Sequence, residues 1–108
     1  MDLHRLAEER SVAYHSAIAT LLRDRPEVLE NARRKVQSWL DREGGATFYA
    51  RKWAEVLAGD PVSIAAFLRE RSQFADALRQ SSPFAGALSP QERWKIWRET
   101  RERFTGQP

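Results

Sequence analysis

The sequence predicts an all-α fold, a small bundle of about five or six amphipathic helices in a single domain covering residues 1–108. Three observations predict it. Apolar residues recur at three- and four-residue steps along most of the chain, as in helices that bury one face. Proline and capping residues stand together where several of these stripes begin. Sustained alternation of apolar and β-branched residues with polar ones, the pattern of a half-buried strand, is missing.

The first two helices are predicted to be the longest. Residues 3–22 form one amphipathic stripe, with Leu3, Leu6, Ala7, Ala13, Tyr14, Ala17, Ile18 and Leu21 at helical spacing. The segment 24–27 ends that helix and begins the next, because Asp24 and Glu27 have the spacing of a capping box and Pro26 fits a first turn. The second helix is predicted to continue to about Arg42, before Gly44 and Gly45 break the chain.

The middle of the chain is predicted to form short helices. Residues 47–58 place Tyr49, Trp53, Val56 and Leu57 on one face, and Gly59 follows as the C′ residue. Asp60 and Pro61 are an N-cap and N1 pair that opens a helix through about Arg69. Ser72 caps a further short helix with Phe74 and Leu78 inward; a continuous helix over 61–80 is the alternative.

The last helix has the clearest start in the chain. Ser89 is the predicted N-cap, Pro90 occupies N1 and Glu92 occupies N3. This helix is predicted to run to about Phe104, and the tail 105–108 is predicted to fray.

Composition narrows the class of protein. Apolar residues make up 42% of the chain and charged residues 31%, as in ordinary globular proteins. No apolar run is long enough to span a bilayer, the N-terminus has no apolar signal region, and cysteine is absent, so we expect a cytoplasmic protein without disulfides. The net charge is +3 with fifteen arginines and three lysines. This bias is typical either of a GC-rich genome or of a protein that binds nucleic acid or an acidic partner.

The sequence carries no sign of catalysis. His4 and His15 share a helix face but lie about 16 Å apart along the axis, too far to ligate one metal ion. Gly44 and Gly45 lack the lysine and hydroxyl residue of a phosphate-binding loop, and no serine stands in a strained elbow. We therefore expect a binding protein rather than an enzyme, with no cofactor and no metal.

The candidate binding site lies in the C-terminal third. Trp94, Trp97, Arg101 and Phe104 follow one another at helical spacing, and such a stripe either docks on the core or binds another protein. Tryptophan and arginine dominate protein–protein binding energies. Four tryptophans are many for six short helices to bury, which favours an exposed aromatic patch. The predicted partner-binding residues are Phe84, Arg93, Trp94, Trp97, Arg98 and Arg101.

Three segments resemble a family of short helical bacterial proteins. They are Leu3-His4-Arg5-Leu6-Ala7-Glu8-Glu9-Arg10-Ser11, Arg79-Gln80-Ser81-Ser82-Pro83-Phe84-Ala85-Gly86, and Glu92-Arg93-Trp94 with Trp97-Arg98. Members of that family are often encoded beside nucleotidyltransferase-like toxins and are suspected antitoxins. The resemblance implies that this chain binds and neutralises a toxin, and a nucleotidyltransferase is the candidate partner. It carries over no residue of known role, and an N-terminal DNA-binding domain like that of many antitoxins is not evident here.

Two other functions remain open on the sequence. A nucleic-acid-binding protein would use arginines on phosphates and tryptophans as stacking platforms, although residues 89–108 carry five basic residues against three acidic ones. A small structural or adaptor subunit is the other alternative. The partner's identity and the oligomeric state do not follow from the sequence.

Overall fold

The computed structural model describes residues 2–106, and within them it confirms the predicted all-α class with six helices and no strand. The helices are α1 (Leu3–Leu21), α2 (Pro26–Asp41), α3 (Phe48–Leu57), α4 (Pro61–Leu68), α5 (Gln73–Arg79) and α6 (Pro90–Thr105). As predicted, α1 is the longest, but α6 equals α2 with 16 residues each.

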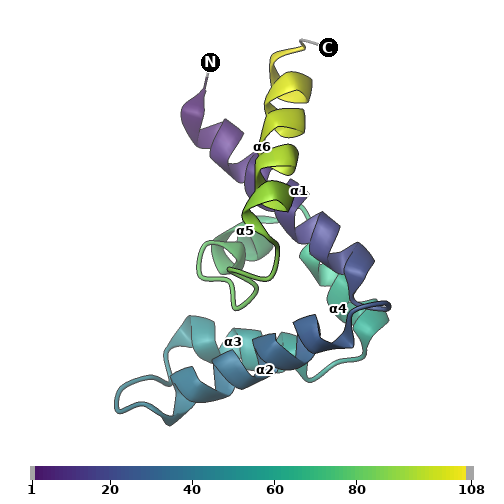
Figure 1. The fold of residues 1–108 in the computed structure, drawn as a ribbon. Coiled ribbons are helices and arrows are strands. Elements are labelled where there is room, and N and C mark those ends of the chain that lie inside the picture. Colours follow the sequence, from purple (N-terminus) through teal and green to yellow (C-terminus); the bar gives the residue numbers. More distant parts are fainter. Residues whose placement is uncertain (1, 107–108) are drawn as a thin grey trace.

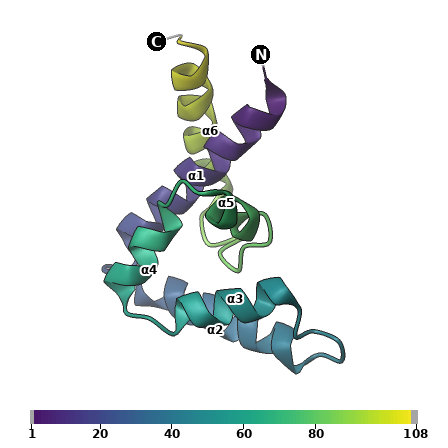
Figure 2. The same ribbon diagram turned by 180° about the vertical axis from the view of Figure 1, so that it is seen from behind.

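The helices form two pairs joined by shorter elements. α1 packs against α6, and α2 packs against α3. α4 and α5 bridge these pairs, and the loop before α6 returns the chain to α1 (Figure 1). Seen from behind, the start of α1 and the end of α6 lie at the same end of the molecule (Figure 2). Segments from both ends of the sequence are thereby brought together.

Side-chain caps begin four of the last five helices. The Ser89 hydroxyl accepts a hydrogen bond from the Glu92 amide at 3.1 Å, and the Glu92 carboxylate accepts one from the Ser89 amide at 3.0 Å. This is the predicted capping box, and it lowers the pKa of Glu92 because the amide hydrogen bond favours the carboxylate. Thr47, Asp60 and Ser72 cap α3, α4 and α5 in the same manner. Residues 61–80 therefore form two helices rather than one.

The prediction for the start of α2 is wrong. Its N-cap is Arg25, which makes no side-chain capping bond, and Pro26 takes the first helical position. The amides of Asp24 and Arg25 both donate to the Leu21 carbonyl, at 3.1 and 2.8 Å. Asp24 is thus held in the turn that closes α1, one residue too early to cap α2.

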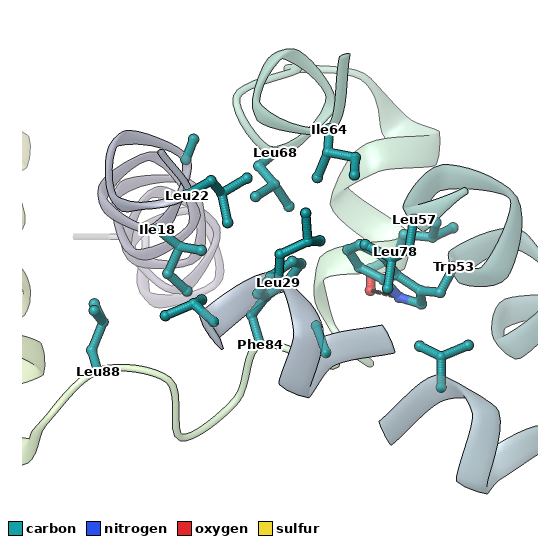
Figure 3. Packing of buried hydrophobic residues seen from close by; sticks show 14 residues of the cluster. Ile18, Leu22, Leu29, Trp53, Leu57, Ile64, Leu68, Leu78, Phe84 and Leu88 are labelled. Carbon is teal, nitrogen blue, oxygen red and sulfur yellow. Dashed lines mark hydrogen bonds between the residues drawn. The ribbon is translucent and has the colours of Figure 1, made fainter. Parts of the chain in front are cut away.

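The core lies where α1, α2, α3 and α4 meet the loop before α6. Trp53, Leu57 and Leu78 gather on one side of it, and Ile18, Leu22 and Leu68 lie on the other (Figure 3). Trp53 is fully buried, and its indole N–H donates to the Leu78 carbonyl at 3.0 Å. A buried indole requires such a partner, and this bond ties α3 to α5.

Four residues predicted on inward faces are exposed. Leu3 and Ala7 lie near the start of α1, where Leu6 alone of the predicted stripe is buried. The other two belong to later helices. Tyr49 lies at the start of α3, where its ring meets the neighbouring Phe48 ring edge to face rather than the core. Phe74 rests on Phe67 at the edge of the bundle, with ring centroids 6.1 Å apart. α5 is only seven residues long and buries Ala75, Leu78 and Arg79 instead.

At the C-terminus, α6 extends through Thr105, and Gly106 has a φ of 71° as its C-cap. The rest of the predicted frayed tail, residues 107 and 108, lies outside the described residues.

Candidate functional site

A groove of about 940 Å³ separates the α1–α6 pair from the turn between α2 and α3. We call it the α1–α6 groove. Its α1 wall is formed by Ala7, Arg10, Ser11, Tyr14 and His15, its turn wall by Trp39, Arg42, Glu43, Gly44, Gly45, Thr47, Tyr49 and Ala50, and its remaining surface by Arg79, Gln80, Ser81, Ser82, Ala85, Gly86, Arg93 and Trp97.

The shape of the turn wall depends on a glycine. A Cβ atom on Gly45 would lie 1.8 Å from the Trp39 carbonyl oxygen, so only glycine allows the chain to pass there. The Gly45 amide donates to the Arg42 carbonyl at 2.9 Å, which closes the turn. The Gly-Gly pair recognised in the sequence as a chain break therefore brings Trp39 and Arg42 to the edge of the groove.

A chain of hydrogen bonds fixes the floor of the groove. His15 donates from Nδ1 to the Ser11 carbonyl at 2.8 Å, so its Nε2 accepts from the Ser82 hydroxyl at 2.7 Å. The Ser82 oxygen also accepts from the Phe84 amide at 3.0 Å, and the Tyr14 hydroxyl donates to the Phe84 carbonyl at 2.7 Å. These bonds attach the loop before α6 to α1.

The electrostatics of His15 favour a structural role for the His15–Ser82 pair. Burial lowers the pKa of His15 to about 4, which outweighs the hydrogen bond to Ser11, and the nearby Arg79 guanidinium lowers it further. The imidazole is therefore neutral at pH 7 and is a weak base. A nucleophile–base pair works best when the pKa of the base lies near the working pH. The distance between the two side chains fits such a pair, but the pKa does not.

The arginines of the groove fall into two kinds. Arg79 is buried and already paired: it donates to the Glu70 carbonyl at 2.7 Å and to the Asp76 carboxylate. Arg10, Arg42 and Arg93 differ, because within residues 2–106 their side chains make no hydrogen bond and no ion pair. Four arginines and one glutamate line the groove, so basic side chains outnumber acidic ones along its walls.

The outer face of α6 combines tryptophan with cations. The Trp94 side chain is 62% exposed and that of Trp97 is 41% exposed. Arg98 and Arg101 follow at helical spacing, and we call Trp94, Trp97, Arg98 and Arg101 the α6 stripe. The opposite face of α6 packs inward through Ile96 and the buried Thr100.

The exposed charges of α6 all have one sign. Lys95, Arg98, Arg101 and Arg103 are exposed, whereas Glu92, Glu99 and Glu102 are half-buried. Glu92 is further occupied by its capping bond and by Arg25, whose nitrogen lies 3.7 Å away. The sequence alone shows five basic and three acidic residues here, and the structure separates them by exposure.

The structure divides the predicted binding residues into three groups. Trp94, Trp97, Arg98 and Arg101 form the exposed α6 stripe, and Arg93 points to the groove. Phe84 was expected on the binding surface, but that placement is wrong. Its side chain is 1% exposed and packs edge to face on Trp53, with ring centroids 6.1 Å apart. The apolar loop that carries Phe84 folds inward because Ser82 and the Phe84 carbonyl are hydrogen-bonded to α1.

Sequence reasoning missed the α1 side of the site. Arg10 stacks on Trp97, its guanidinium carbon 5.6 Å from the ring centroid. The only local signal is that Ala7, Arg10, Ser11 and Tyr14 have helical spacing, which places Arg10 beside small and aromatic residues rather than among Glu8 and Glu9.

Within the described part of the chain, no group of three or more His, Asp or Glu side chains could hold a metal ion. Over the same residues, no helix is both long and apolar enough to cross a bilayer. None of the protein-family models, curated protein sequences or solved structures searched matches this chain with significance.

Proposed function

We propose that this chain is an antitoxin-like binding protein that uses the α6 stripe to bind an acidic surface of a toxin. The observation that carries the proposal is the exposure of Trp94 and Trp97 on a helix whose exposed charges are all basic. Exposed tryptophans beside arginines are the residue types that contribute most to protein–protein affinity.

Charge complementarity favours an acidic partner. Arg98 and Arg101 are exposed, and within residues 2–106 neither side chain is engaged in an ion pair. Their guanidinium groups are free to form bidentate bonds with carboxylates, which are stronger and more directional than bonds from lysine. A surface of this sign attracts an acidic protein and speeds the encounter with it.

The choice of a toxin as partner rests on the resemblance of residues 3–11, 79–86 and 92–98 to suspected antitoxins. The structure gives two of these segments a shared location. Residues 3–11 and 92–98 lie on α1 and α6, which pack against each other. Residues 79–86 form part of the groove beside them. Binding by this region would cover the toxin's active site or hold the toxin in an inactive form.

Charge reversal on the stripe tests the proposal. We expect Arg98→Glu with Arg101→Glu to abolish co-purification of the toxin from host cells, and to leave its growth arrest unrelieved on co-expression. Carboxylates there would repel the partner's acidic surface. The matched control is Arg23→Glu with Arg51→Glu, which changes the net charge equally at exposed sites on α1–α2 and α3.

Both variants should keep the helical circular dichroism spectrum and the thermal melt of the wild type. The proposal is contradicted if the stripe variant binds and neutralises as well as the control does. Co-purification of RNA or DNA whose retention falls steeply with salt would favour the nucleic-acid-binding alternative instead.

A further inference from the structure

Two buried arginine nitrogens in the α1–α6 groove lack an acceptor. The Nε atoms of Arg10 and Arg93 are inaccessible to solvent, and in the described part of the chain they have no hydrogen-bond partner. Leaving a buried donor of a charged group unpaired is costly. Arg79 Nε shares this condition, but the other guanidinium nitrogens of Arg79 are bound to Asp76 and to backbone carbonyls.

Arg10 and Arg93 lie at the same end of the groove. Arg93 precedes Trp97 by one helical turn on α6, so the two side chains are neighbours on one face. Arg10 reaches the same place from α1, with its guanidinium carbon 5.6 Å from the Trp97 ring centroid. Arg10 therefore stacks on the Trp97 ring from α1, and Arg93 lies one turn before Trp97 on α6.

Among residues 2–106, no carboxylate forms an ion pair with Arg10 or Arg93. The one acidic residue that lines the groove, Glu43, belongs to the turn wall between α2 and α3. Like charges held together without a counter-ion repel, and an oxyanion relieves that repulsion while accepting bidentate bonds from the guanidinium groups. The site is therefore suited to a phosphate group.

The rest of the groove is suited to a flat ring. Trp39 and Tyr49 line the turn wall, Tyr14 lines the α1 wall, and the polar residues Ser11, Thr47 and Ser82 line the groove with them. The volume of about 940 Å³ is within the range of small-molecule sites, which combine apolar and aromatic walls with a few polar groups.

We propose that the α1–α6 groove binds a nucleoside phosphate, with its phosphate on Arg10 and Arg93 and its base against the aromatic side chains of the groove. This site is separate from the function proposed for the α6 stripe, although Trp97 borders both. It requires no protein partner, so it can be tested on the purified chain and can fail independently of toxin binding.

The experiment is a calorimetric titration of the purified full-length chain at low ionic strength. The probes are the four ribonucleoside monophosphates. Adenosine and inorganic phosphate are titrated separately, because they are the two parts of adenosine monophosphate. We expect saturable one-to-one binding of at least one monophosphate. We expect adenosine and phosphate alone to bind at least about tenfold more weakly, because each meets only part of the site.

Variants locate the phosphate contact. Arg10→Gln and Arg93→Gln should each weaken the monophosphate about tenfold, since each removes a charge-assisted bond. Arg23→Gln with Arg51→Gln removes two exposed charges outside the groove and should leave the affinity unchanged within about twofold. The two groove variants are compared singly, and each is first checked for a wild-type thermal melt. If either variant melts at a lower temperature than the wild type, its affinity is not interpreted. The proposal is then tested by the wild-type affinities alone, with the monophosphate compared with adenosine and with inorganic phosphate.

The proposal is overturned if none of the four monophosphates binds, or if the groove variants bind as well as the control. It is also overturned if inorganic phosphate alone binds as tightly as the monophosphate, because the base then makes no contact. A five-nucleotide RNA is titrated as well. If it binds more than about tenfold tighter than the monophosphate, the proposal is overturned and the groove is a nucleic-acid-binding site.

Discussion

Replacing Phe84 by alanine should lower the free energy of unfolding by about 3–5 kcal/mol, the usual loss when a buried aromatic side chain is truncated. The Phe84 side chain is 1% exposed, and its ring meets Trp53 and His15 edge to face with centroids 6.1 and 6.4 Å apart. The backbone on both sides of the ring is held by Ser82 and Tyr14, so the loop cannot collapse easily into the cavity.

A chemical denaturation curve followed by circular dichroism measures this loss. Phe48→Ala is the matched control, because Phe48 is 54% exposed and lies outside the core, and we expect it to cost less than about 1 kcal/mol. An unfolding free energy of Phe84→Ala equal to that of the control would show that Phe84 is a surface residue after all.

Acidification should weaken the fold through His15. The pKa of His15 is about 4 in the folded chain against an ordinary 6.5. Below pH 6.5 the unfolded chain therefore binds a proton that the folded chain excludes, and acid favours unfolding. The stability associated with His15 is fully present above pH 6.5, and about 3 kcal/mol is lost by pH 4. About 2 kcal/mol of that loss falls above pH 5.

The unfolding free energy between pH 7 and pH 5 tests this result. In that range Asp60 and Glu92 contribute little, because their ordinary pKa values of 3.8 and 4.5 lie below pH 5. Hydrogen bonds from the Ser63 amide to Asp60 and from the Ser89 amide to Glu92 lower the folded-state pKa values further. His15→Gln should flatten the pH dependence, because glutamine does not titrate. A wild-type slope that persists in His15→Gln would assign the acid sensitivity to other groups.

Local signals in the sequence were sufficient for the secondary structure. Ser89 with Glu92, Asp60 with Pro61, and Ser72 each mark a helix start by the hydrogen bond their side chain makes, and the structure confirms all three. The prediction for Asp24 was wrong because a capping residue must stand at one exact position before the helix. The Leu21 carbonyl accepts the amides of Asp24 and Arg25 in the turn, and this leaves Asp24 one residue before the N-cap.

Burial could be predicted less well, because it depends on contacts between distant segments. Trp53 and Leu57 were correctly predicted to be inward, since α3 has a clear amphipathic period and packs on α2. Phe84 lies in a loop without any period, and its burial follows from hydrogen bonds made by Tyr14 and His15, far away in the sequence.

The candidate site was half predictable for the same reason. The α6 stripe lies on one helix, so helical spacing alone placed Trp94, Trp97 and Arg101 together, with Arg98 beside them. The α1–α6 groove combines Arg10 and Arg93, which meet only because the first and last helices pack against each other. The contact between these two helices could not be predicted from the residues around Arg10.

The most direct test of the α6 stripe as a protein interface is the affinity of the purified toxin for the variant Trp94→Ala. Calorimetry measures the dissociation constant of the toxin for this variant, for the wild-type chain and for Phe48→Ala. Trp94 is the most exposed tryptophan, so its removal should leave the thermal melt intact. We expect Trp94→Ala to raise the dissociation constant about thirtyfold, corresponding to about 2 kcal/mol, with Phe48→Ala within about twofold of wild type. Equal dissociation constants for all three proteins would contradict the account and place the interface on another face.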